Sequence, residues 1–191
     1  MNNKPENTKS ASKQDQFMEL YRSVHDGFVR YCKAKAYGII DFEDLINESI
    51  TRAFEGFNRL KNKSLFPAYL YAIARNVIKN ELRSRNYQND YQQSLVDKDL
   101  VERNHADKKF EIEILYQALS ALPEDQKEAL ILFEISGYSI KEIAQMQDCS
   151  QDAVKQRLKR GREKLAIILG TKIKVPISKI QQASVLLTLF F

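Results

Sequence analysis

The sequence predicts an all-α fold with two small helical domains joined by a flexible linker, the second a helix-turn-helix domain. Apolar residues recur at helical spacing along most of the chain, which is typical of amphipathic helices. Glycine and proline, which interrupt helices, number only 6 and 4 among 191 residues. Residues 86–109 are polar, mixed in charge and poorly periodic, as inter-domain linkers are. The domains are therefore expected over 14–85 and 110–169, with a disordered tail over 1–13 and a C-terminal tail over 170–191 of no assigned role.

The overall composition favours a polyanionic partner in a reducing compartment. The formal charge is +5 and the sequence pI about 9.1, while a hydrophobic content of 43% suffices for compact helical cores. Cys32 and Cys149 are too far apart and too few for a disulfide framework or a zinc pattern, which suits the cytosol. Residues 1–16 contain no apolar run, so no signal peptide is expected. The apolar run over 185–191 is too short for a bilayer, which needs about 20 residues, so no membrane insertion is expected.

The first domain contains an acidic helix face inside a positive protein. A helix is expected over 14–37, ended by Gly38, and Asp41 can cap a second helix over about 42–57. That second helix has an apolar side and an opposite polar side with Asp44, Glu48, Thr51 and Glu55. Residues 41–55 hold five acidic side chains and one arginine, which predicts a negative surface.

A basic segment follows the acidic helix. Residues 58–64 form a polar, basic loop, and a further helix is expected over 67–85. Residues 59–85 contain seven Lys/Arg against the single acidic residue Glu81. The helical spacing buries Phe66, for which we expect a place in the core. The same spacing exposes Arg75, Asn76, Lys79 and Arg83.

The second domain ends in a helix-turn-helix pattern. Helices are expected from Phe110 and over 124–135, the latter ended by Gly137. Ser139 and Glu142 have the spacing of a capping box, which marks the start of another helix. Residues 148–150 form a turn, and Ser150 can cap the last helix.

The last helix has a basic face opposite its apolar face. The apolar side carries Val154, Leu158, Gly161 and Leu165. The opposite, polar side carries Asp152, Lys155, Gln156, Lys159, Arg160 and Glu163. A solvated surface helix also has a charged face. Here, however, residues 151–164 hold six Lys/Arg and two Asp/Glu. This excess of positive charge is larger than solvation of the helix requires. The pattern therefore favours insertion into a DNA major groove.

The sequence does not indicate an enzyme or a cofactor. Its two histidines, His25 and His105, lie far apart. No pairing of a nucleophile with a base and no metal-ligand spacing occurs.

Two blocks of the sequence resemble the sigma factors of bacterial RNA polymerase, in particular the extracytoplasmic-function group of the sigma-70 family. Residues 41–48, DFEDLINE, and 69–76, YLYAIARN, are similar to the patterns D-x-E-D-L-x-Q-E and W-L-x-x-I-A-x-N. Residues 122–158 are similar to L-P…G-x-S-x-x-E-I-A…V-K-x-R-L. The departures are Asn47 for Gln, Tyr69 for Trp, Asn80 for Asp, Ala153 for Thr and Gly161 for Ala, and they leave the promoter preference open.

The resemblance implies a site on each domain. Core RNA polymerase would dock on Asp44, Asn47, Glu48 and Thr51. A separated minus-ten strand of promoter DNA would contact Arg59, Lys61, Lys63, Arg75, Asn76, Lys79 and Arg83. The duplex minus-thirty-five element would contact Lys155, Gln156, Arg157, Lys159 and Arg160. For Arg157 we expect phosphate or intramolecular bonds rather than base readout, and Asn76 either contacts DNA or caps a local turn.

The resemblance also implies an anti-sigma factor as a partner and a polymerase channel as the path of the linker. Two other functions stay open. One is a stand-alone helix-turn-helix regulator, which would not need residues 41–85. The other is a sigma-like protein that has lost promoter opening and serves only as an interaction partner.

Overall fold

The computed structural model describes residues 12–91 and 108–173, and every regular element in these ranges is helical. This confirms the predicted all-α fold. The parts of the predicted tails and linker over 1–11, 92–107 and 174–191 lie outside the described residues. None of the described helices is both long enough and apolar enough to cross a membrane.

The first domain is a three-helix unit that begins at a capping box. Its elements are α1 (Lys13–Ala36), α2 (Phe42–Gly56), the 3-10 turns η1 (Phe57–Arg59) and η2 (Lys63–Leu65), and α3 (Phe66–Tyr91). Ser12 and Asp15 cap each other's backbone N–H at the start of α1. Gly38, with φ of +73°, turns the chain after α1, and Asp41 Oδ1 accepts the N–H of Glu43 at 2.7 Å to start α2. The predicted cap at Asp41 is therefore confirmed.

An aromatic cluster holds these three helices together. The Phe17 ring of α1 meets the rings of Phe57 and Phe66 edge to face, each at 5.3 Å between centroids. Phe66 is buried, which confirms its predicted place in the core. Leu45 of α2 and Leu70 of α3 are fully buried beside this cluster. Because α2 buries Leu45 and Ala53, its opposite side faces solvent.

The second domain contains the helix-turn-helix. Its elements are α4 (Lys108–Ser120), α5 (Glu124–Leu130), a π-helical turn η3 (Ile131–Ile135), α6 (Ile140–Met146) and α7 (Gln151–Ile173). The Ser139–Glu142 capping box starts α6 as predicted. Asp148, with φ of 49°, forms the turn, and Ser150 Oγ accepts the N–H of Ala153 at 3.1 Å to start α7. Both predicted helix starts are confirmed.

Gly161 allows α7 to approach α5 closely. A Cβ at this position would lie 2.9 Å from Cδ1 of Leu130 and 3.5 Å from Cβ of Gln126. Leu130 is itself buried, so its side chain has little room to move. The glycine that departs from the family pattern is thus explained by helix packing within the domain.

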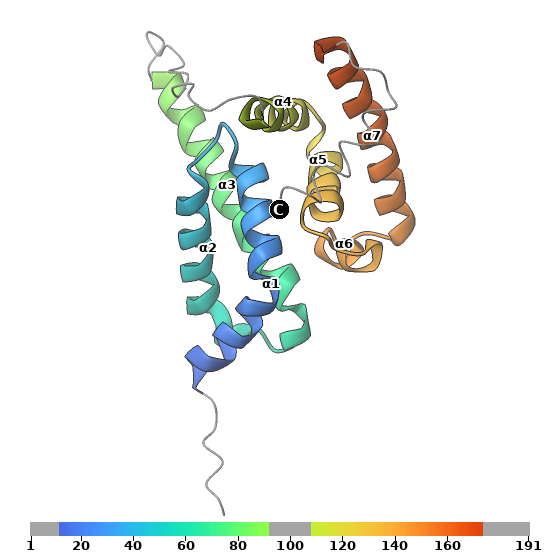
Figure 1. Ribbon diagram of the computed structural model, residues 1–191. Coiled ribbons are helices and arrows are strands. Elements are labelled where there is room, and N and C mark those ends of the chain that lie inside the picture. The colour runs from blue at the N-terminus through green and yellow to red at the C-terminus, as the bar shows by residue number, and fades with distance from the viewer. Residues whose placement is uncertain (1–11, 92–107, 174–191) are drawn as a thin grey trace, which may run out of the picture.

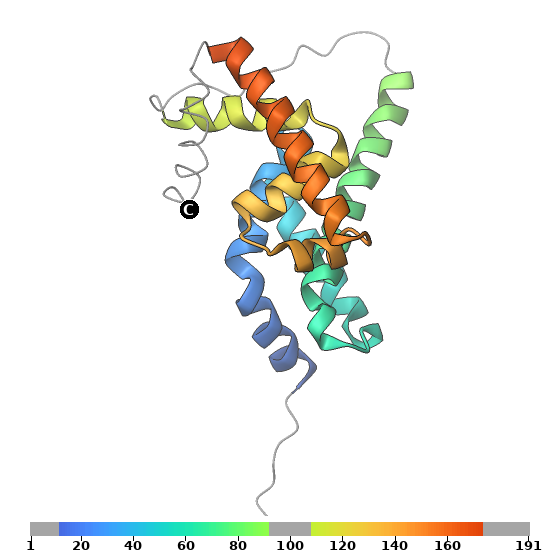
Figure 2. The same ribbon diagram turned by 90° about the vertical axis from the view of Figure 1, so that its right-hand side faces the viewer.

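The two domains pack against each other. Figures 1 and 2 show α5 and α6 beside the first domain and α7 on the far side of them; η3 packs against α1 and α6 against α3. At the upper end in Figure 1, α4 lies next to the end of α1, where the Tyr37 and Tyr116 rings are 5.5 Å apart. We call this inter-domain contact the seam.

Candidate nucleic-acid interface

The acidic face of α2, defined by Asp44, Asn47, Glu48 and Thr51, is exposed along its whole length. Arg52 Nε donates to Glu48 Oε1 at 2.6 Å, and the Thr51 hydroxyl donates to the carbonyl of Asn47 at 2.8 Å. These contacts lie within the face and leave Asp44 and Glu48 open to solvent. The face therefore presents carboxylates to a basic partner.

The basic loop between α2 and α3 is held by one of its own lysines. Lys63 Nζ donates to the carbonyl of Phe57 at 3.0 Å and lies 3.4 Å from the centroid of the Phe57 ring. Asn62 Oδ1 accepts the N–H of Ser64 at 3.0 Å and starts η2. Lys63 thus shapes the loop, while Arg59 and Lys61 are exposed.

The exposed face of α3 carries Asn76, Lys79 and Arg83 at helical spacing. The prediction that Arg75 belongs to this exposed face is wrong. Its side chain is 32% exposed and lies in the seam. Its Nη2 donates to the carbonyl of Met146 at 3.0 Å, because α6 of the second domain packs on α3 at this point.

Tyr69, which stands where the family has Trp, packs against Gly56 of α2. The Tyr69 hydroxyl donates to the carbonyl of Ala53 at 3.2 Å. A Cβ at Gly56 would lie 2.3 Å from that hydroxyl oxygen. The tyrosine reaches across α2 only because residue 56 has no side chain, so the departure is accommodated locally.

The basic face of α7 is exposed where the sequence predicts it. Lys155, Gln156, Lys159 and Arg160 all face solvent, and Lys155 Nζ is 2.9 Å from Oδ1 of Asp152. Val154 and Leu158 are buried on the other side, which confirms the two predicted faces.

Arg157 is bound within the domain. Its Nη1 donates to Gln147 Oε1 at 2.8 Å, and its Nε lies 3.2 Å from Oδ2 of Asp125. Of the two roles expected for Arg157, the structure shows intramolecular bonding. The guanidinium ties the turn of the helix-turn-helix to α5 and so fixes the orientation of α7.

A group of charged residues in the seam was not predicted from the sequence. Arg30 Nε donates to the carbonyl of Ile135 at 2.8 Å, and the Tyr31 hydroxyl donates to Glu128 Oε1 at 3.0 Å. Lys35 pairs with Glu124. Sequence patterns carry no signal for these contacts, because isolated Lys and Glu residues are usually solvated.

Burial shifts the pKa values of Lys35 and Tyr31 in the seam. Desolvation lowers the pKa of Lys35 from 10.5 to about 8, although the Glu128 carboxylate acts in the opposite direction. Desolvation, reinforced by Glu128, raises the pKa of Tyr31 well above its usual range. Tyr31 is therefore a permanent hydrogen-bond donor at neutral pH.

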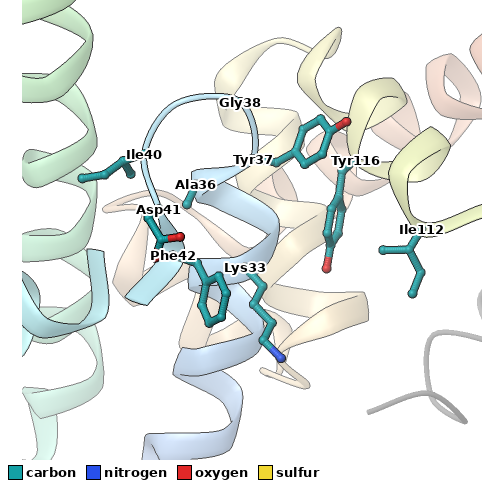
Figure 3. A pocket seen from close by; sticks show the side chains of 9 residues that line it. All are labelled: Lys33, Ala36, Tyr37, Gly38, Ile40, Asp41, Phe42, Ile112 and Tyr116. Atoms are coloured by element: carbon teal, nitrogen blue, oxygen red, sulfur yellow. The ribbon is translucent and has the colours of Figure 1, made fainter. Parts of the chain in front are cut away.

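A groove of about 430 Å³ opens at the α4 end of the seam. Figure 3 shows Tyr37 and Tyr116 on one side of it and Phe42 with Lys33 on the other. Its lining is mainly apolar and aromatic. Among residues 12–91 and 108–173, no cluster of His, Cys, Asp or Glu is placed to hold a metal ion.

These features define a two-domain protein with a helix-turn-helix and separate acidic and basic surfaces. Residues 17–87 match the family model described as Sigma-70 region 2, and residues 112–165 match that of Sigma-70, region 4. The ECF RNA polymerase sigma factor EcfG of Rhodopseudomonas palustris is 32% identical over 127 residues, which are 66% of this chain and 70% of that protein. The ECF RNA polymerase sigma-E factor of Haemophilus influenzae is 31% identical over 138 residues, 64% of this chain and 71% of that protein. The chain belongs to the ECF group of RNA polymerase sigma factors.

A solved structure has the same fold. The sigma factor RpoE of Bartonella quintana, in complex with the anti-sigma factor NepR, matches with a TM-score of 0.66. The match covers 82% of this chain and 98% of that one at 22% sequence identity. It confirms the fold of two helical domains.

Proposed function

We propose that this sigma factor docks on core RNA polymerase through the acidic face of α2 and recognises promoters with both domains to initiate transcription. The observation that supports this proposal is the separation of the charged surfaces. The acidic face lies on α2, one basic surface on the loop and α3, and another on α7. A stand-alone regulator needs only the last of these surfaces and an interface for dimerisation.

In the first domain, we assign the minus-ten contacts to the loop and to α3. Arg59 and Lys61 on the loop, with Lys79 and Arg83 on α3, are exposed cations that can meet the phosphates of a separated strand. Asn76 lies on the same exposed face and can contact DNA. Lys63 and Arg75 belong to the proposed site as well, and Arg75 can reach DNA only if the seam opens.

In the second domain, we assign the minus-thirty-five contacts to α7. Gln156 can pair bidentately with adenine in the major groove. Lys155, Lys159 and Arg160 supply cations for guanine or phosphate. Arg157 acts by holding the turn, since its guanidinium is bound to Gln147 and Asp125.

The proposal includes an anti-sigma factor as a regulatory partner and the cytoplasm as the location. The Bartonella quintana sigma factor was solved with the anti-sigma factor NepR. Polymerase and promoter DNA, the other proposed partners, are cytoplasmic in bacteria. In this proposal the protein binds polymerase and promoter DNA and positions them, and it carries out no reaction of its own.

Transcription by reconstituted polymerase tests the proposal. Core polymerase with this protein should start transcripts from a small, related subset of a promoter library, and core polymerase alone should not. If the added protein changes no start site, the proposed function is refuted. If it represses transcription from sites that it binds alone, the protein is a stand-alone regulator instead.

A further inference from the structure

The groove at the α4 end of the seam has apolar walls that are open to solvent. Phe42 begins α2, Tyr37 follows α1, and Ile112 with Tyr116 belongs to α4 (Figure 3). Phe42 and Ile112 are only half-buried, so apolar atoms of both face water. Contiguous apolar surface of this kind usually marks a place where another apolar group binds. The volume of about 430 Å³ lies within the range of ligand pockets, roughly 300–1,000 Å³, and admits a few large side chains.

Residues 185–191, VLLTLFF, are an apolar run that lies outside the described residues. Six of its seven residues are apolar and none is charged. Removing such side chains from water is favourable in proportion to the apolar area that is covered. The run is too short for a bilayer, which needs about 20 residues. A protein surface is therefore the cover that its chemistry calls for.

We propose that the groove binds Phe190 and Phe191 of the same chain. Aromatic rings pair edge to face or offset with each other, with centroids about 4.5–7 Å apart. Three walls of the groove are aromatic, namely Tyr37, Phe42 and Tyr116. This lining favours the two phenylalanines over the leucines that precede them. In this arrangement, residues 185–191 are covered by α1, α2 and α4 rather than by a second protein.

The chain is long enough to reach the groove from the end of α7. That helix ends at Ile173 and packs on α4, which also lines the groove. At the upper end of Figure 1, α4 lies between α1 and α7. Residues 174–189 are sixteen residues and span up to about 50 Å when extended. The 13 residues of α4 rise only about 20 Å, and the helix is about 10–12 Å thick, so a path along or around α4 is within reach.

The charges along this path are complementary. Residues 174–184 hold two lysines and no acidic residue. The groove has carboxylates at its edge, since Asp41 lines it and the Tyr37 hydroxyl donates to Glu113 Oε1 at 3.4 Å. Complementary charges at the rim of a contact favour one partner and one orientation over others. A basic segment leading to two phenylalanines therefore matches an aromatic groove with an acidic edge.

Photochemical cross-linking in the full chain tests where the phenylalanines lie. Phe190 is replaced with the photoreactive p-benzoylphenylalanine, and the dilute protein is irradiated and mapped by mass spectrometry. The cross-link should form within one chain, to residues 37–42 or 112–116. Ile112→Glu puts a charge into the groove and should lower the yield about tenfold. Its control, Ala121→Glu, adds the same charge at an exposed position just after α4 and should leave the yield unchanged.

Thiol labelling measures whether the groove is covered. The reporter is Ile112→Cys in a Cys149→Ser background, and the buried Cys32 stays unlabelled. A reference reporter, Lys164→Cys, lies at an exposed position of α7 away from the groove. The ratio of the two labelling rates reports the protection of the groove.

Phe190→Ser with Phe191→Ser should raise the labelling rate of Ile112→Cys about tenfold, because the apolar cover is lost. The matched control is Ile177→Ser with Ile180→Ser, which removes two apolar side chains from the segment that leads to the run. It should change the rate less than about twofold. The reference reporter should respond to neither change.

Three results would overturn the inference. The first is an unchanged rate after the change at Phe190 and Phe191, and the second is an equal increase in the control at Ile177 and Ile180. The third is a cross-link outside the groove or between two chains, the latter showing that a second copy is the occupant. Should Ile112→Glu lose its helical circular dichroism, the labelling rates decide alone. Neither measurement includes DNA or polymerase, so its outcome is independent of the proposed function.

Discussion

Reversing two charges on the acidic face should abolish polymerase binding while the fold survives. The change is Asp44→Lys with Glu48→Lys. Glu48 and Arg52 are 47% and 43% exposed, so their ion pair contributes only about 0.5 kcal/mol. Asp44 lies in the first turn of α2, where a carboxylate contributes roughly 0.5 kcal/mol through the helix dipole. The total cost of about 1 kcal/mol is small beside a typical stability of about 5–15 kcal/mol.

The same reversal should cost far more at an interface with a basic partner. A solvated pair of opposite charges near contact contributes about 1 kcal/mol, and reversal replaces this attraction with a similar repulsion. For two residues the loss is about 4 kcal/mol, or roughly a thousandfold in affinity. Fluorescence anisotropy of labelled protein titrated with core polymerase measures this loss. Circular dichroism and thermal melting verify the fold.

A matched variant makes the result specific to α2. Glu19→Lys with Asp26→Lys changes the net charge equally on exposed positions of α1. This control should bind core polymerase within a few-fold of the wild type. Undiminished binding by the folded α2 variant, or an equal loss in the α1 control, would refute the docking assignment.

Three further predictions concern DNA contacts and packing. Lys79→Ala with Arg83→Ala should weaken transcription across a whole promoter library, whereas Gln156→Ala should change the preferred sequence, because phosphate contacts carry no base identity; the reverse pattern would exchange their roles. Gly161→Ala should lower the free energy of unfolding by about 1 kcal/mol. Overpacking against Leu130 costs about 2 kcal/mol, and the higher helix propensity of alanine offsets about 1 kcal/mol of it. A raised melting temperature would contradict this. Lys35 has its pKa lowered by burial from 10.5 to about 8, so between these values the unfolded chain binds a proton that the folded protein has released. Wild-type stability should thus gain from Lys35 as pH rises from 8 to 10.5. Lys35→Met removes the buried charge and should raise the melting temperature most below pH 8. An increase in melting temperature that does not shrink toward pH 10 would contradict the burial argument.

Local features of this fold could be predicted because local chemistry decides them. Ser139, Ser150 and Asp41 bind the N–H groups of residues two or three positions away, so their spacing in the sequence is the spacing in the structure. The exposed face of α7 follows in the same way from helical periodicity. Even the internal role of Arg157 follows from its position near the buried side of that helix.

The seam could not be predicted because it depends on residues far apart in the chain. Arg75 has the spacing of an exposed residue within its own helix, and only the arrival of α6 covers it. Glu128 and Lys35 have no neighbour in sequence that marks them as buried. The contact of Lys63 with its own loop could not be predicted either, because the sequence does not show that the Phe57 ring lies beneath it.

DNA binding with and without core polymerase tests the central claim most directly. Each basic surface alone offers few base contacts, and the Arg75 guanidinium is bound within the seam. Gel-shift titrations should therefore show weak, salt-sensitive and sequence-blind binding by the free protein, and tight binding to promoter over scrambled duplex once core polymerase is present. Tight, sequence-specific binding by the free protein would instead identify a stand-alone regulator and contradict the account.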